Sequence, residues 1–144
     1  MIVNADITLY NRYYSKEKQC DKYIRTYLRG VNWQGKQAVQ VGYKGINSAD
    51  VISIYIPKGV DSDLKEYISP KKYKDLSEKE KERYFTFTYG DKIVKGIIDF
   101  DLTGIKPNNE KYLEESYDDV VTIISTIFND NGSYNMQHWK VGCE

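Results

Sequence analysis

The sequence predicts a mainly β protein, a small antiparallel β-barrel or sandwich that carries a long glycine-rich loop and a short helical insertion. Tyrosine supplies 14 of the 144 residues, and aromatic residues favour half-buried strands and contact surfaces. Apolar runs of strand length recur along the chain, whereas the helix signals are brief. The length is that of one domain, so we expect residues 1–144 to form a single barrel-like domain.

The first two strands are expected at residues 6–13 and 21–28, which are rich in aromatic and β-branched residues. The polar segment 15–19 separates them, so the two runs predict an opening hairpin. Side chains of the second run alternate between two faces, as a strand requires.

Residues 30–47 are rich in glycine and fit no regular period. Glycine allows backbone shapes that other residues avoid, and ordered glycine-rich segments are often working loops. We therefore expect a long projecting loop here. An apolar strand is expected next, at 50–57, ending at Pro57.

Residues 58–84 are dense in charge and interrupt the strand pattern. Ser69-Pro70 is a helix-start pair, and Ser77 through Glu80 fits the capping-box pattern, so two short helical turns are expected. The positive and negative charges nearly cancel. This balance favours a solvated insertion, with a binding arm as the alternative.

The following segments predict a strand–turn–strand unit, with strands at 85–88 and 92–100 around a turn at 89–91. A loop is expected at 103–109. Residues 110–115 are then long enough for one helical turn.

The last segment predicts a long hairpin with strands at 120–128 and 134–141. The Asn-Gly pair at 131–132 supplies the positive φ angles of a tight hairpin turn. The hairpin holds the one histidine, His138, and one of the two tryptophans, Trp139.

The charges of the chain balance, because lysine plus arginine and aspartate plus glutamate both number 21. Proteins whose main task is to grip nucleic acid normally carry a basic surplus, since their affinity comes from releasing counterions. We therefore expect no general affinity for nucleic acid or anionic membranes. No apolar run approaches the roughly 20 residues that span a bilayer, and the first residues lack the features of a signal peptide.

Few residues are candidates for catalysis. A nucleophile needs an adjacent base, most often histidine, and His138 with Cys143 is the pair that the sequence offers. Cys143 lies at a position where chains fray, so an ordinary strand histidine is favoured. Cys20 and Cys143 lack the spacing of metal ligands, and we expect both as reduced thiols.

Close carboxylates occur at Asp99 with Asp101 and at Asp118 with Asp119, which is compatible with a glycosidase or a divalent ion. Solvation of a sheet edge explains them more simply. The glycine-rich segment contains neither of the common phosphate-loop patterns. We expect no cofactor, no metal and no enzymatic activity.

The tyrosines near the start of the chain fit a different function, because exposed rings on a barrel can stack single-stranded bases or hold a small ligand. These residues are Tyr10, Tyr13, Tyr14, Tyr23 and Tyr27. The balanced charge disfavours nucleic acid, so packing within the core and between subunits is the favoured role.

Four segments, 4–11, 30–36, 90–96 and 136–142, resemble a family of small virion structural proteins from tailed bacteriophages and prophages of low-GC Gram-positive bacteria. The similarity covers nearly the whole chain. Members of that family are encoded among virion structural genes, between capsid and tail. The resemblance therefore implies a structural protein of the virion.

A weaker likeness is to head-closure or stopper proteins, small β-barrels that form a ring beneath the portal and adaptor. The shared feature is a glycine-led turn into an apolar strand, here residues 90–94. The likeness implies that the 30–47 loop can shut the channel, although the 58–84 insertion is larger than in those proteins. A tail terminator or tail completion ring is the nearest alternative.

We therefore expect a non-enzymatic head–tail connector that forms a homo-oligomeric ring in the neck of the virion, and that is present in the host cytoplasm during assembly. Its expected partners are further copies of itself, the phage portal or adaptor, and tail or tail-terminator proteins. Genome DNA would pass through without specific binding, and no membrane is involved. Burial of Trp33 in its own subunit and cover by a partner are equally compatible with the sequence. The residues expected at protein interfaces are Trp33, Gln34, Lys36, Tyr43, Lys72, Tyr73, Tyr134, His138 and Trp139.

Overall fold

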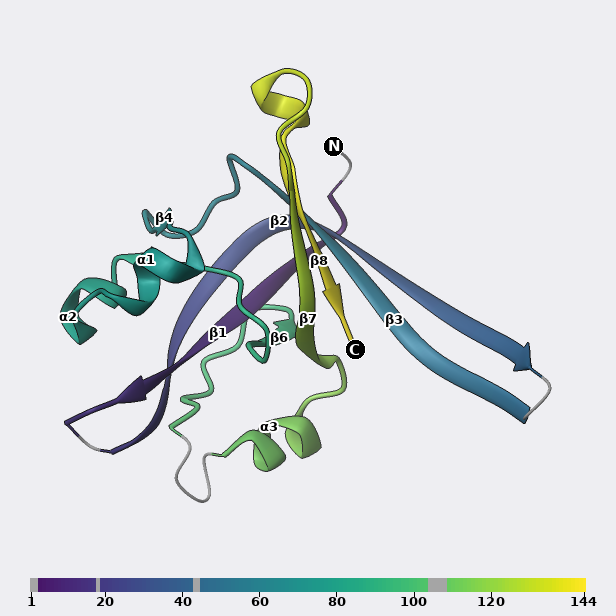
Figure 1. The fold of residues 1–144 in the computed structure, drawn as a ribbon, viewed down its shortest axis with the longest axis horizontal. Helices are drawn as coiled ribbons and strands as arrows, with labels where there is room; N and C mark the ends of the chain where they lie inside the picture. The colour runs from purple at the N-terminus through teal and green to yellow at the C-terminus, as the bar shows by residue number, and fades with distance from the viewer. Residues whose placement is uncertain (1–2, 18, 43–44, 104–108) are drawn as a thin grey trace.

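Six antiparallel strands close into a barrel in the computed structural model (Figure 1). The structure describes residues 3–17, 19–42, 45–103 and 109–144. For the strand residues between 36 and 51 it describes the backbone alone. The strands pair in the order β1-β2-β3-β8-β7-β6. Their bounds are β1 Ala5–Ser15, β2 Cys20–Gly42, β3 Gly45–Pro57, β6 Lys92–Lys95, β7 Val120–Asn129 and β8 His138–Cys143. The predicted mainly β fold is confirmed.

The opening hairpin is confirmed. β1 pairs with β2 from Ser15 opposite Cys20 to Ala5 opposite Val31, in continuous antiparallel register apart from one irregularity at Ala5. Thr26 and Leu28 on one face of β2 are buried, in agreement with the alternation of side chains in the sequence.

Apolar side chains fill the barrel interior. The cluster combines inward-facing residues of all six strands with aromatic rings of the 58–84 insertion and the segment that follows it. Trp139 lies 4.6 Å from Tyr67 and 5.7 Å from Phe87 between ring centroids, so aromatic side chains plug one part of the barrel. The fully buried members are Ile7, Leu9, Leu28, Val31, Ile54, Ile56, Ile93, Ile123, Val141 and Cys143.

The 58–84 insertion forms the two expected helical turns, α1 Pro70–Lys74 and α2 Glu78–Lys81. The Ser77 hydroxyl accepts a hydrogen bond from the Glu80 amide at 3.2 Å, as the capping box predicts. Two short strands, β4 Glu66–Tyr67 and β5 Tyr84–Phe85, flank the two helical turns in sequence and pair in parallel. The insertion is not simply a solvated excursion, because Tyr73 and Lys81 are buried in it.

The strand–turn–strand unit predicted at 85–100 is confirmed only in its turn and in the first part of its second strand, β6. The turn is present, since Gly90 has φ +93°, but of the predicted first strand only Phe85 is paired, with β4, and residues 86–88 lie in no strand. β6 itself ends early, because Gly96 takes φ +99° and its amide donates to the Asp6 carbonyl at 2.7 Å.

The expected helical segment is confirmed as α3 Glu110–Ser116, which at seven residues makes about two turns instead of one. The Asn109 side chain caps it by accepting from the Tyr112 amide at 2.9 Å. Leu113 of this helix packs with Tyr10 and Leu102 in a second, smaller apolar cluster.

The terminal hairpin is confirmed as β7 and β8, but its connection is longer than a tight turn. Gly132 has the predicted positive φ of +86°, whereas residues 134–136 form a 3-10 turn, η1 Tyr134–Met136, so β8 starts only at His138. Lys58 holds this connection, because its amide donates to the Gln137 carbonyl at 3.0 Å.

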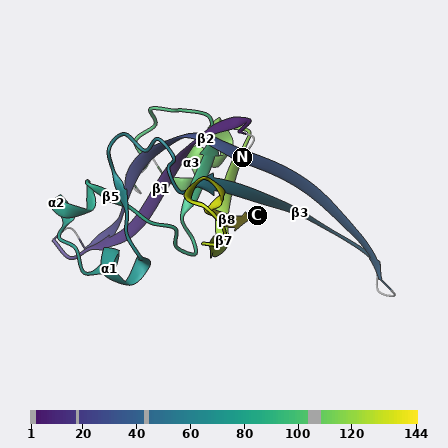
Figure 2. The ribbon, with the colours of Figure 1, turned by 90° about the horizontal axis from the view of Figure 1, so that it is seen from above.

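The prediction of a loop at residues 30–47 is wrong. β2 and β3 continue past the barrel as a hairpin with register from Asn32 opposite Tyr55 to Gly42 opposite Gly45. Figures 1 and 2 show this hairpin reaching away from the rest of the molecule. The segment is therefore regular and extended, and it projects as a ribbon.

Candidate interaction site

The arm, defined as residues 36–42 of β2 and 45–51 of β3, is the most prominent feature outside the barrel (Figure 2). β8 pairs with β3 only from Ile52 to Pro57, and β1 pairs with β2 only as far as Val31. Within the described residues, the strands of the arm therefore pair only with each other. Seven residue pairs at about 3.4 Å each give the arm a length of about 24 Å.

The base of the arm is fixed to the barrel. Trp33 is 8% exposed and belongs to the core cluster, its amide donates to the Asn4 side chain at 2.8 Å, and its carbonyl accepts from the same side chain at 3.1 Å. Lys95 lies over the indole ring, 5.6 Å from its centroid. Of the two alternatives for Trp33, burial within its own subunit is the correct one.

The other expected contact residues of this segment follow Trp33 toward the end of the arm. Gln34 is exposed and donates to the Asn32 side chain at 2.5 Å. Lys36 lies at the start of the arm, in the part of β2 described by its backbone alone, and Tyr43 lies outside the described residues.

A second exposed surface lies at the far end of the β7–β8 hairpin. We call it the hairpin tip, and it consists of Ile127, Phe128, Tyr134 and Met136, which are 55%, 42%, 57% and 65% exposed. The Lys58 ammonium lies over the Phe128 and Tyr134 rings, at 5.9 and 5.3 Å from their centroids. Of the predicted contact residues, Tyr134 is therefore open to a partner.

His138 is half-buried, and both of its ring nitrogens are engaged. Nδ1 donates to the Met136 carbonyl at 2.9 Å, because a carbonyl can only accept. Nε2 accordingly accepts from the Asn129 side-chain amide at 3.1 Å. The ring also lies 5.7 Å from the Tyr55 ring. This is an ordinary strand histidine that joins β3, β7 and the hairpin connection.

The structure separates the candidate nucleophile from the histidine. β8 alternates half-buried and buried residues, so His138 and Cys143 lie on opposite faces of the strand. Cys143 is fully buried, and burial raises the pKa of its thiol to about 12. Trp139, on the buried face, is 5% exposed and belongs to the core, so little of its side chain is left for a partner.

The two expected contact residues of the insertion differ in exposure. Lys72 is exposed on α1, whereas Tyr73 is 4% exposed beneath it. Lys81 lies over the Tyr73 ring at 5.5 Å from the centroid, and burial raises the pKa of the Tyr73 hydroxyl.

Most of the tyrosines considered for base stacking hold the fold together. The hydroxyl of Tyr10 donates to the Phe100 carbonyl, and that of Tyr27 to the Ile98 carbonyl, both at 2.7 Å. The Tyr23 hydroxyl bonds the Glu110 carboxylate. They anchor the segment after β6 and helix α3, so they do not present a row of free rings.

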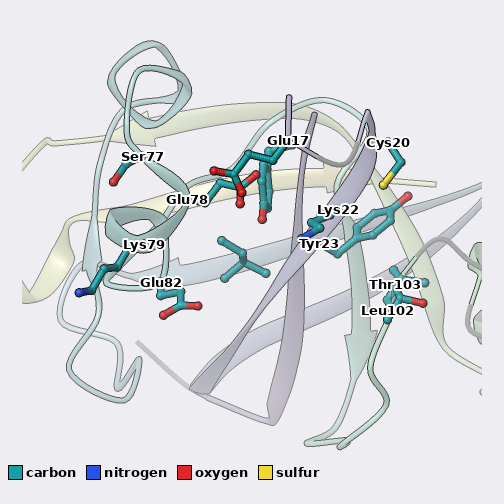
Figure 3. Close-up of a pocket in the computed structure, with 12 residues that line it drawn as sticks. Glu17, Cys20, Lys22, Tyr23, Ser77, Glu78, Lys79, Glu82, Leu102 and Thr103 are labelled. Atoms are coloured by element: carbon teal, nitrogen blue, oxygen red, sulfur yellow. The ribbon is translucent and has the colours of Figure 1, made fainter. Parts of the chain in front are cut away.

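A groove of about 790 Å³ lies between the β1–β2 turn, α2 and the segment around Leu102. Figure 3 shows Glu17 and Glu78 close together on one side of it and Cys20 beside Tyr23 on the other. Glu78 is tied to the fold, because it accepts a hydrogen bond from the Ser15 hydroxyl at 2.5 Å. The described lining contains no histidine.

The close carboxylates do not gather into a metal site, since the described residues contain no group of three or more metal-ligating side chains. Asp101 pairs with Arg25 at 3.2 Å, and Asp118 and Asp119 are exposed.

Asp91 is the carboxylate that sequence analysis missed. It is 1% exposed, and it accepts hydrogen bonds from the Arg12 amide at 3.0 Å, the Asn11 side chain at 2.8 Å and the Thr88 amide at 3.1 Å. Burial raises its pKa to about 6, against the opposing effect of these hydrogen bonds. Its position after Gly90 in a glycine-led turn is the only sequence signal, and that pattern is common in turns.

These features define a class of protein: a closed antiparallel barrel filled with side chains, with an extended arm and an exposed apolar hairpin tip. The chain belongs to the family of unknown function DUF6751, whose sequence model matches residues 2–144. No curated protein and no solved structure matches the chain. Among the described residues, no helix has both the length and the apolar character needed to cross a membrane.

Proposed function

We propose that this protein is a structural subunit of the bacteriophage neck, a head–tail connector of the stopper type that forms a ring between the portal or adaptor and the tail. The arm is the observation that carries this proposal. An isolated two-stranded hairpin is at best marginally stable in water, because it has no core of its own. We therefore expect contacts with other protein subunits to stabilise the arm, which is about 24 Å long.

The filled barrel supports a structural role. Its interior is occupied by apolar side chains, so the fold leaves no lumen of the kind in which larger barrels hold ligands. The opposite faces of His138 and Cys143 remove the one nucleophile–base pair that the sequence offered.

The charge balance fits a channel for DNA. A ring through which the genome slides must bind the phosphate backbone weakly, and a net charge of zero gives little gain from counterion release. The resemblance of segments 4–11, 30–36, 90–96 and 136–142 to virion proteins points to the same role.

Particles made by a phage or prophage that lacks this gene test the proposal by electron microscopy. We expect filled or emptied heads separated from complete tails, and joined particles when the wild-type gene is supplied in trans. Heads of normal appearance accompanied by tails of abnormal length would instead assign the protein to a tail terminator or tail completion ring. Complete, infectious virions would refute both roles.

A further inference from the structure

Two strand edges have no partner within the described part of the subunit. The first belongs to the arm, whose strands pair only with each other. The second is residues 124–129 of β7. β6 pairs with β7 only between Val120 and Thr122, and the Gly90 amide then bonds the Ile123 carbonyl at 2.9 Å. We call residues 124–129 the free edge.

A comparable edge elsewhere in the barrel is covered by the chain itself. β6 pairs with β1 only as far as Tyr10. Beyond that point the Asp91 carboxylate accepts from the Arg12 amide at 3.0 Å, and Glu78 accepts from the Ser15 hydroxyl at 2.5 Å. The free edge of β7 therefore differs from its counterpart in β1.

Within the arm, charge is confined to the residues nearest the barrel, Lys36 and Asp50, and the free edge carries none. Residues 37–42, 45–49 and 124–129 contain no lysine, arginine, aspartate or glutamate. Exposed strand edges are normally protected by charged residues or proline, since they otherwise invite pairing with another chain. Both edges therefore have the composition of strands that are covered in the assembled state.

The register identifies the backbone groups that face outward from β7. Thr122 and Glu144 exchange two hydrogen bonds of 3.0 Å, and bonded pairs alternate with non-bonded pairs along an antiparallel ladder. Val141 comes three residues before Glu144, an odd number, so its backbone groups face away from β7. It stands opposite Thr126. The amide and carbonyl groups of Thr126 and Phe128 consequently point to the free edge, away from β8.

The available area indicates how much the arm can contribute. A ribbon about 24 Å long and about 10 Å wide has two faces and an outer edge that total about 600 Å², which is the upper limit of what the arm can bury. A stable interface buries about 800 Å² from each partner. The arm therefore supplies only part of the surface on its own side of the contact, and on the side of the second copy the exposed side chains of Ile127 and Phe128 lie beside the free edge.

We propose that the arm of one subunit pairs with the free edge of β7 in a second copy of this chain, and so extends the β3–β8–β7 sheet of that copy by a strand. This inference deepens the proposed ring function and rests on it. β7 lies two strands away from β3 in the barrel order, so the arm and the free edge are different surfaces of one subunit. Such a contact is head-to-tail, and it closes into a ring when the rotation between subunits permits.

Two variants of the full chain separate the two halves of the contact. In the first, residues 36–51 are replaced by Asn-Gly, a two-residue turn that joins Gly35 to Ile52, which already lie opposite each other. The second is Thr126→Pro, which removes the amide facing the free edge while leaving the hydrogen bonds to β8. Thr126→Val is the matched control, because it keeps the amide and the branched side chain.

Native mass spectrometry and size-exclusion chromatography at about 50 µM give the readout, with circular dichroism to confirm folding. We expect the wild-type chain and Thr126→Val to form oligomers, and each of the two variants alone to associate at least tenfold more weakly. An equimolar mixture of the two variants should form dimers that grow no further, because one supplies the arm and the other the free edge.

Several results would overturn the pairing: a monomeric wild-type chain, oligomers of either variant alone that match the wild type, or a mixture that stays monomeric. These experiments distinguish a failure of the pairing from a failure of the proposed neck function. If the mixture forms dimers but virions assemble without the gene, the neck function fails and the pairing stands. If virions need the gene but Thr126→Pro assembles like Thr126→Val, the pairing fails and the neck function stands.

Discussion

The buried carboxylate of Asp91 predicts how the stability of the barrel changes with pH. Burial raises its pKa to about 6 in the folded protein, from an ordinary value of 3.8. Between these two values the folded chain holds a proton that the unfolded chain has lost, so folding becomes less favourable as the pH rises. A difference of about two pKa units, at about 1.4 kcal/mol each, corresponds to about 3 kcal/mol over the whole titration. About 2 kcal/mol of this falls between pH 4 and pH 7, because pH 4 already lies above the pKa of the unfolded chain.

Asp91→Asn isolates this contribution, because the amide is nearly isosteric with the carboxylate and does not titrate. Urea unfolding at each pH gives the free energy of unfolding of both proteins, and the other carboxylates cancel in the difference. We expect the stability of the wild type relative to Asp91→Asn to fall by about 2 kcal/mol from pH 4 to pH 7. Asp118→Asn, at an exposed position, should give a profile parallel to the wild type. Parallel profiles for Asp91→Asn as well would refute the argument.

Three further predictions concern single positions. Gly90→Ala should lower the free energy of unfolding by about 1–2 kcal/mol, because residue 90 has φ +93° and a Cβ there would lie 2.9 Å from Nη2 of Arg12; urea unfolding measures the change, and an unaltered midpoint would contradict it. Trp139→Ala should cost about 3–5 kcal/mol, since it empties the centre of the aromatic cluster; a loss below 1 kcal/mol in the same assay would show that the ring is not packed as described. A thiol reagent at pH 8 should label Cys20 quickly and Cys143 only after unfolding, because Cys143 is fully buried and its pKa is raised to about 12; equal labelling rates in the native protein would contradict its burial.

Local sequence patterns were enough to predict the hairpins, because pairing of neighbouring strands depends on nearby residues. The polar turn at 15–19 and the flanking aromatic runs specify β1 and β2. The capping box at Ser77 likewise specifies α2 through a contact three residues away.

The arm differs from the predicted loop because the glycines of this segment lie within regular strands. Gly35 lies within β2 opposite Ile52, and it adopts no positive φ angle. The valines at 39 and 41, separated by Gln40, were the strand signal in that segment. A glycine can interrupt an apolar run or lie within a strand, and the long-range partner decides between them.

Some candidate contact residues are buried and others are exposed, again because long-range strand pairing decides their environment. Trp33 and Trp139 are candidates because large apolar side chains are costly to expose, which favours core packing for Trp139 and leaves both alternatives open for Trp33. The barrel buries both of them. Tyr134 stays exposed on the connection between β7 and β8, where no core lies within reach. Residue type alone cannot distinguish these cases, because burial depends on which strands close the barrel.

Electron microscopy of the purified full-length protein tests the central claim most directly, namely that this barrel functions by joining copies of itself. We expect closed rings with a central channel and one barrel per subunit, with the arm of each subunit reaching its neighbour. A homogeneous population of separate monomers at about 100 µM, with the arm free in solution, would contradict the account.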